Sequence, residues 1–345
     1  MSFGTCPPPQ DQGLKSIQMS HGGGGSMMQR LLQHQVFPAF HSNHMNAHDS
    51  AIIPSSGQRL AFTTDSFVVS PRFFPGGNIG TLAAYGTIND LAMSGAEAKH
   101  MSCSIIIEEG FGISELKQIL DSLGEAAKKE GVHIVTGDTK VVESGKGDGL
   151  YINTSGIGFL THNQVIEPSS IQDGDAIIAS GDVGRHGATI MATRHGFEMG
   201  DELQSDCASL KSPVKDLLSH NIKVHCMRDF TRGGLATTLC ELAEQSGLGM
   251  RILEDQVPVC PPVRGICEVL GIDPLYMANE GRFGVILPES EVTGALNILK
   301  KYEVSKEAKV IGYVSKALSA LSSENSFGAT RLLPFLRGEQ LPRIC

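Results

Sequence analysis

The sequence lacks the features that send a chain into or across a membrane. None of its apolar runs approaches 18 residues, the length that a transmembrane helix needs. The first residues contain no basic stretch followed by an apolar core, so they predict no secretory signal, and we expect a cytoplasmic protein. Positive charge is not in excess either. The formal net charge of −9 argues against nucleic acid or an anionic membrane as the main partner.

Paired cysteines are also missing. The eight cysteines include no C-x-x-C pair, which favours reduced thiols over a disulfide framework or a structural zinc site. One of them, Cys345, is the last residue. Prenylation of the C-a-a-X type does not fit, because Pro342 occupies the position of the lipidated cysteine.

Cys345 has two readings from its residue type. An incidental surface thiol is the first, and residue chemistry alone favours it. The alternative is a covalent carrier, because a thiol on a flexible C-terminal tail can be presented to a partner and then drawn into a pocket.

The common nucleotide-binding motifs are absent. The chain has no G-x-x-x-x-G-K-[ST] and no G-x-G-x-x-G after a strand, so a P-loop enzyme and a dinucleotide fold are unsupported. The run GGGGS at 22–26 is either a linker or a loop that folds over a bound phosphate. The group His41, His44 and His48 is typical of a solvated connector, with a metal site as the alternative.

Strand and helix patterns alternate along the chain and predict a mixed α/β (α+β) fold in two halves. We expect an N-terminal extension with the glycine-rich loop (1–48), an N-terminal domain (49–166), a C-terminal domain (167–324) and a tail (325–345). Strands are predicted at 52–53, 60–64, 67–69, 103–107, 132–136, 151–160, 176–180, 284–288 and 309–314. Helices are predicted at 78–94, 114–129 (capped by Ser114), 187–195, 213–219, 235–244 and 292–302.

Four acidic residues stand beside small or turn-forming residues at predicted junctions: Asp65, Asp90, Asp138 and Asp229. Each alone is typical of a turn or a helix cap. Together they make a metal–phosphate site plausible, because Mg²⁺ prefers carboxylate oxygens with phosphate and water in the remaining positions.

Further residues suit an anionic substrate. Gly233 and Gly234 lead into a predicted helix whose N–H groups would face an anion, and Arg232 would add a planar donor. Lys140 can neutralise phosphoryl oxygens and Glu280 can exchange a proton, although each is equally typical of a surface or turn position.

Several motifs together resemble the HypE family of NiFe-hydrogenase maturation proteins, which is related to aminoimidazole ribonucleotide synthetase and selenophosphate synthetase. The resemblance covers the chain from about His21 to Cys345. It rests on FTTDSFVV (62–69), FFPGGNIG (73–80), GTINDLA (86–92), VTGDTKVV (135–142), RDFTRGG (228–234) and the final PRIC (342–345).

The resemblance implies a two-domain PurM-like fold that dimerises through a β-barrel of N-terminal domains, with ATP and Mg²⁺ in a cleft between domains. Carried over by motif, the metal ligands would be Asp65, Asp90 and Asp229. The wider nucleotide shell would add Asn89, Asp138, Thr139 and Arg232, and the catalytic residues would be Cys345, Lys140 and Glu280.

The implied reaction is an ATP-dependent dehydration. A partner carbamoyltransferase, HypF, would place a carbamoyl group on Cys345. ATP would then phosphorylate the carbamoyl oxygen, and loss of phosphate would leave an S-cyano group (a thiocyanate) whose cyanide passes to iron on a HypC–HypD complex. Two alternatives stay open at this point: a small-molecule kinase in which Cys345 is incidental, and a non-catalytic thiol carrier.

Overall fold

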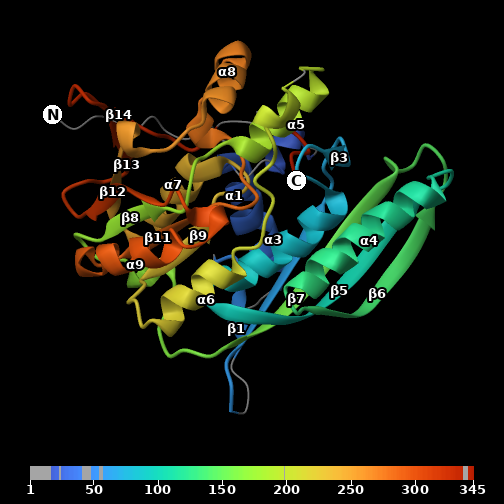
Figure 1. Ribbon diagram of the computed structural model, residues 1–345, viewed down its shortest axis with the longest axis horizontal. Helices are drawn as coiled ribbons and strands as arrows, with labels where there is room; N and C mark the ends of the chain where they lie inside the picture. The colour runs from blue at the N-terminus through green and yellow to red at the C-terminus, as the bar shows by residue number, and fades with distance from the viewer. Residues whose placement is uncertain (1–16, 23–24, 41–47, 54–56, 198, 337–340) are drawn as a thin grey trace.

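The computed structural model describes residues 17–22, 25–40, 48–53, 57–197, 199–336 and 341–345 (Figure 1). Two β-sheets, one in each half of the chain, are covered by helices and meet along a central helix. The predicted α/β organisation in two domains is therefore confirmed. No helix in the described ranges combines the length and apolar character that crossing a bilayer demands.

The N-terminal domain is built on a five-stranded sheet whose strand order is β1-β2-β7-β5-β6. Neighbouring strands are antiparallel except β5 and β6, which run parallel. Helices α3 (Ile79–Met93) and α4 (Ile113–Lys129) pack on one face, and β7 alternates between buried and half-buried residues as a one-sided sheet requires. The strands are β1 (Ala51–Ile53), β2 (Leu60–Phe67), β5 (Ala96–Glu108), β6 (His133–Val142) and β7 (Leu150–Leu160), and a small hairpin joins β3 (Phe73–Phe74) to β4 (Gly77–Asn78).

The C-terminal domain has a seven-stranded sheet of order β14-β13-β10-β12-β8-β11-β9. Both faces are covered, because in the fully buried strand β8 the side chain of Ile177 packs with α7 while that of Ile178 packs with α6 and α9. The strands are β8 (Ala176–Ala179), β9 (Cys226–Asp229), β10 (Gly249–Leu253), β11 (Phe283–Leu287), β12 (Lys309–Ser315), β13 (Leu321–Glu324) and β14 (Thr330–Leu332). The helices are α5 (Arg185–Arg194), α6 (Lys211–Ser219), α7 (Gly234–Ser246), α8 (Pro261–Leu270) and α9 (Val292–Leu299).

Helix α3 joins the two domains. It packs against β2 and β7 on one side and against β9 and α6 on the other, so most of its residues are buried (Figure 1). The Asn78 side chain caps the helix by accepting hydrogen bonds from the backbone N–H groups of Gly80 and Thr81. Because α3 lies between the domains, the side chain of Asp90, near the C-terminal end of the helix, faces the boundary between them.

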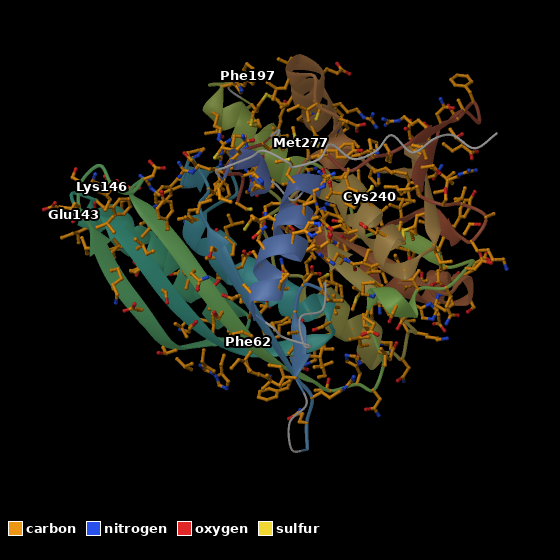
Figure 2. All side chains as sticks on the ribbon, turned by 180° about the vertical axis from the view of Figure 1, so that it is seen from behind. Phe62, Glu143, Lys146, Phe197, Cys240 and Met277 are labelled. Atoms are coloured by element: carbon orange, nitrogen blue, oxygen red, sulfur yellow. The ribbon has the colours of Figure 1, made fainter. Side chains whose placement is uncertain are left out.

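The N-terminal segment crosses that boundary from behind (Figure 2). It contains α1 (Ser26–Leu31), a π-helical turn (Leu32–Val36) and α2 (Phe37–Phe40). Gln29 donates a hydrogen bond from Nε2 to Oε1 of Glu241 on α7 at 2.9 Å, which ties α1 to the C-terminal domain.

Several predicted elements differ from those observed. Asp65, Asp90 and Asp138 lie inside β2, α3 and β6, and only Asp229 ends its element as predicted. For Asp65 and Asp138 the reason is that sheet pairing extends strands through polar residues that local patterns read as turns. Helix α4 begins after Gly112 without a side-chain cap, so the predicted Ser114 cap is wrong. Strands β9, β10, β13 and β14 and helix α8 were not predicted, and β14 extends the sheet into the predicted tail.

Among the described residues, the N-terminal sheet is open. β1 and β6 form its edges, and it does not close into a barrel within the single chain.

Candidate active site at the domain boundary

Three carboxylates from distant parts of the chain meet at the domain boundary. Asp49 precedes β1, Asp90 lies near the end of α3 and Asp229 is the last residue of β9. One oxygen from each lies within 4.8 Å of the others. The hydroxyl of Thr63 on β2 donates a hydrogen bond to Oδ2 of Asp90 at 2.8 Å, so the neighbouring strand orients that carboxylate.

These carboxylates line a cavity of about 220 Å³. Asp65 on β2, Glu280 in the turn before β11 and the C-terminal Cys345 line the same cavity, and Met28 and Gln29 of α1 contribute to its wall. The structure therefore brings together the predicted Asp65, Asp90, Asp229, Arg232, Glu280 and Cys345, together with Asp49, which sequence reasoning missed.

Burial and mutual repulsion favour the protonated acids here. Removal from water raises the pKa of Asp49, Asp65 and Asp90, and the neighbouring carboxylates add to the rise at Asp49 and Asp90. The pKa of Asp229 is raised to about 6 by burial, with Asp65 contributing. A cation bound among these acids would stabilise their ionised forms by offsetting the repulsion between the carboxylates.

Arg228 anchors one side of the cluster. Its guanidinium forms ion pairs with Asp49 and, at 3.1 Å, with Glu241, and all three side chains are largely buried. Oδ2 of Asp49 is buried with no hydrogen-bond partner among the described residues. Asp49 therefore keeps one oxygen available to a ligand in the cavity.

Glu280 lines the same cavity. It is 4% exposed, and its Oε1 is also buried without a hydrogen-bond partner among the described residues. Burial raises its pKa well above the usual range, and Asp229, Asp206 and Asp65 raise it further. Glu280 is therefore a carboxyl with a free oxygen and a high affinity for a proton.

The C-terminal tail is seated in this region. The backbone N–H of Val68 donates to a backbone oxygen of Cys345 at 3.0 Å, and that of Ser70 donates to the carbonyl oxygen of Arg343 at 3.2 Å. Ile344 is buried in the core of the N-terminal domain. Val68 and Val69, predicted as strand, thus lie beyond β2, and Val68 pairs with the tail instead.

Two side chains of α5 hold the tail carbonyls. Arg194 donates to the carbonyl oxygens of Pro342 at 2.6 Å and Arg343 at 2.5 Å. Nε2 of His186 lies 2.7 Å from the carbonyl oxygen of Ile344, which can only accept, so Nε2 carries the proton. Neither residue had a signal in the sequence, because their role depends on contacts more than 140 positions away.

The Cys345 thiol is held in its protonated form. Burial raises its pKa, and the carboxylates of Glu280, Asp65 and Asp229 add to the effect, while Arg232 opposes it. Arg232 lines both the acidic cavity and an adjoining, mainly apolar cavity of about 440 Å³, and Cys345 lines both as well. The thiol therefore lies where the two cavities meet.

Three predicted site residues lie elsewhere. Asp138, Thr139 and Lys140 are exposed on β6, where Lys140 pairs with Asp138, and none lines the acidic cavity. Asp65 is in register with Thr154, Cys103 and Gly137 across β7, β5 and β6. Three strand spacings separate β2 from β6, about 14 Å.

Asn89 does not line the acidic cavity either. Its side-chain amide forms hydrogen bonds through both its oxygen and its nitrogen with the segment between α5 and α6. Oδ1 accepts from the backbone N–H of Leu210 at 2.8 Å, and Nδ2 donates to Ala208 at 3.0 Å. His41 and His44 lie outside the described residues. His48 is described, and burial lowers its pKa to about 3, so its imidazole is neutral.

Comparison with known proteins assigns the family. The AIR synthase related protein family matches over both domains, its N-terminal domain at residues 47–160 and its C-terminal domain at 172–320. A carbamoyl dehydratase HypE of Cupriavidus necator is 43% identical over 332 residues, covering 95% of each chain. That of Escherichia coli K12 is 40% identical, covering 96% of this chain and all of the relative. The chain belongs to the HypE family.

Solved structures agree with this assignment. A HypE structure in complex with ATP superposes with a TM-score of 0.81 at 42% identity, covering 96% of this chain and 100% of the other. A chain in a HypE–HypF complex superposes with a TM-score of 0.84 at 39% identity, covering 89% and 99%. The PurM-like two-domain fold implied by the sequence motifs is thereby confirmed.

Proposed function

We propose that this protein is an ATP-dependent carbamoyl dehydratase whose substrate is a carbamoyl group carried on its own Cys345. The observation that carries the proposal is the position of the C-terminal thiol, which lines one cavity together with four aspartates, Glu241 and Glu280. An incidental surface cysteine would have no reason to be half-buried beside these acids. Two relatives that are 40% and 43% identical are named carbamoyl dehydratases, which supports the same activity.

The acidic cavity fits a divalent cation. Its donors are hard carboxylate oxygens from Asp49, Asp90 and Asp229, and Asp65 lines the same cavity. Carboxylate oxygens are the ligands that Mg²⁺ prefers. The buried, unpartnered Oδ2 of Asp49 also fits, because such an atom gains a partner when a cation binds. Mg²⁺ bound there would neutralise the carboxylates and the phosphates of ATP.

ATP would lie with its triphosphate at the carboxylates and its nucleoside toward the adjoining apolar cavity. Arg232, which lines both cavities, is placed to donate to phosphate oxygens. An ATP complex is known for a HypE protein 42% identical to this chain. The position of Cys345 between the cavities would bring the carbamoyl oxygen toward the γ-phosphate.

The proposed reaction removes one water from a primary amide. The carbamoyl oxygen attacks the γ-phosphate, ADP leaves, and the carbon–oxygen bond then breaks as phosphate departs. Both N–H protons leave the nitrogen. One ends on the departing phosphate and one is released to solvent, so Cys345-S-C(O)NH₂ and ATP give Cys345-S-CN, ADP, hydrogen phosphate and a proton. We assign Glu280 the role of base: a cation bound at the neighbouring aspartates would favour its ionised form, whose Oε1, without a hydrogen-bond partner among the described residues, can accept a proton from nitrogen.

Lys140, Asp138 and Thr139 would enter the site from a second copy of the chain. Support comes from β6, an edge strand with nearly every residue exposed, including Val135 at 60% and Val141 at 67%. The helix-free face of the sheet also exposes Phe62 and Ile106. A homodimer that pairs these surfaces would complete the β-barrel and cover the apolar groups.

The partners would be a HypF carbamoyltransferase, which loads Cys345, and a HypC–HypD complex, which receives the cyanide. A complex of HypE with HypF is known for a relative 39% identical to this chain. Loading requires Cys345 to leave its cavity, because the tail is bonded to Val68, Ser70, His186 and Arg194.

Intact-mass measurement tests the function. The protein is carbamoylated on Cys345, and its mass is then followed with ATP and Mg²⁺. We expect the loss of one water only when both are present, no carbamoylation of Cys345→Ala, and carbamoylation without dehydration in Glu280→Gln. Equal ATP turnover with and without the carbamoyl group would favour a kinase acting on a free substrate instead.

A further inference from the structure

One loop touches both the proposed base and the tail that carries the substrate. Residues 203–210, which we call the strap, run without helix or strand from the end of a 3₁₀ turn to the start of α6. Leu203 and Leu210 are buried at its two ends, so the strap is fixed to the core at both. Its middle residues make the contacts described next.

Asp206 holds the backbone of Glu280. Its Oδ1 accepts from the N–H of Glu280 at 3.2 Å and its Oδ2 accepts from the N–H of Gly281 at 3.1 Å. Asp206 is buried, where hydrogen bonds to a carboxylate are strong. The two N–H groups are therefore fixed by one side chain, which sets the direction in which the Glu280 side chain leaves the chain.

The approach of the strap to Glu280 is close enough to require glycine. A Cβ added at Gly281 would lie 1.9 Å from the carbonyl oxygen of Asp206, which no side chain tolerates. The N–H of Ala208 also donates to the carbonyl oxygen of Glu280 at 3.4 Å. The strap thus bonds the backbone of Glu280 on both sides.

Ser205, the neighbour of Asp206, connects the strap to the tail. Its hydroxyl lies 2.8 Å from Nδ1 of His186 and accepts from the N–H of Cys207 at 3.1 Å. With Nε2 of His186 donating to Ile344, Nδ1 must accept, and the Ser205 hydroxyl is the donor. The chain of bonds runs from Cys207 through Ser205 and His186 to the peptide that precedes Cys345.

We propose that the strap sets the distance between Cys345 and Glu280, with Asp206 as the positioning residue of Glu280 and His186 as the positioning residue of the tail. Because Ser205 and Asp206 are consecutive, the position of the tail and the position of Glu280 are both set by the same short segment. Asn89 fixes the far end of the strap to α3, next to Asp90. The inference rests on the proposed dehydration, and it deepens that proposal by naming residues that do not touch the substrate.

Single-turnover dehydration of carbamoylated protein, at saturating ATP and Mg²⁺, tests the strap. Misplacement by about 1 Å can cost about 100-fold in rate, so we expect Asp206→Asn and His186→Leu to slow dehydration by roughly 10- to 100-fold. The final extent of carbamoylation and the ATP concentration for half-maximal rate should stay at wild-type values in both variants. Gln204→Ala, an exposed position in the same strap, is the matched control and should behave as wild type.

Rescue by a conservative variant separates positioning from packing. His186→Gln keeps a nitrogen that can donate to Ile344, so we expect it to recover most of the rate that His186→Leu loses. Ser205→Ala, which removes only a hydroxyl, should slow dehydration less than His186→Leu and keeps the test usable if Asp206→Asn does not fold. Equal rates in His186→Gln and His186→Leu would overturn the role of His186.

A second readout does not depend on the reaction. Alkylation of Cys345, followed by peptide mass without ATP, should be faster in His186→Leu and unchanged in Asp206→Asn. If wild-type protein alkylates as expected but never dehydrates, the proposed function fails while the tail contact stands. If all variants dehydrate at the wild-type rate, or lose ATP binding in step with rate, the strap proposal is overturned and the proposed function is untouched.

Discussion

Val68 donates its backbone N–H to a backbone oxygen of Cys345 at 3.0 Å, so Cys345 is paired with the segment that follows β2. β2 also carries Asp65 and Thr63, which line the acidic cavity. The same stretch of chain therefore positions both the proposed metal–phosphate site and the thiol. The accessibility of the Cys345 thiol to alkylation therefore reports whether the tail is bound in place.

Loss of Arg194 should release the tail. Each hydrogen bond from a charged donor contributes about 1.5–3 kcal/mol, so we expect Arg194→Ala to raise the alkylation rate of Cys345 by about 10-fold or more. Release should also return the raised thiol pKa toward its ordinary value, so the alkylation profile moves to lower pH. Peptide mass mapping measures both. Arg331→Ala, on the exposed strand β14, is the control, and an unchanged rate in Arg194→Ala would contradict the prediction.

Asp49 should be needed for the divalent cation although the sequence did not single it out. Asp49→Asn removes a carboxylate that lies close to those of Asp90 and Asp229. We expect the Mg²⁺ concentration needed for half-maximal dehydration to rise by more than about 10-fold. A titration of Mg²⁺ at fixed ATP measures it. Asp173→Asn, an exposed carboxylate that pairs with Lys316, should leave the titration unchanged.

The exposed edge of the N-terminal sheet should be a dimer interface. Placing charge on β6 by Val135→Glu with Val141→Glu buries unpaired carboxylates in that interface, so we expect a monomer by analytical ultracentrifugation. Val269→Glu, on α8 and 70% exposed, is the control that should keep the wild-type mass. A wild-type protein that sediments as a monomer would exclude the interface outright.

Lys140 should act in the site of the second copy. Lys140→Ala and Asp90→Asn should each abolish dehydration, and co-expression of the two should restore it, because in a mixed dimer one site receives an intact Asp90 and an intact Lys140. Random pairing in a symmetric dimer gives activity at about a quarter of sites. If Lys140 acted within its own chain, the mixture would be as inactive as either variant.

Acidification should reduce the contribution of His186 to the stability of the folded protein. Burial lowers its pKa, Arg194 lowers it further, and the Ile344 carbonyl and Asp206 oppose the shift. Below about pH 6.5 the unfolded chain binds a proton that the folded protein does not, so stability from this residue is present above that pH and lost as pH falls. The difference in melting temperature between wild type and His186→Gln should therefore narrow from about pH 7.5 to about pH 5.5. A constant difference would contradict this.

The sequence predicted most of the long elements because their patterns are local. Helix α4 carries an apolar stripe that is buried as expected, and β7 keeps a strict alternation. Prediction was poorest where pairing decides the element. The short strand β9 and the strand β14 have little local signal, and Asp138 reads as a turn residue although β5 pairs with it in the middle of β6.

The sequence by itself determined the family, the two halves and most of the acidic cavity, because motifs around Asp65, Asp90, Asp229 and Cys345 are contiguous strings. Only the tertiary structure decided how they meet. It added Asp49 and directed the amide of Asn89 to the strap. It also left Lys140 on the edge strand β6, three strand spacings (about 14 Å) from β2, and bonded the residues before Cys345 to His186 and Arg194. These are contacts between segments far apart in the chain, and their distances follow from packing around α3 rather than from any local pattern.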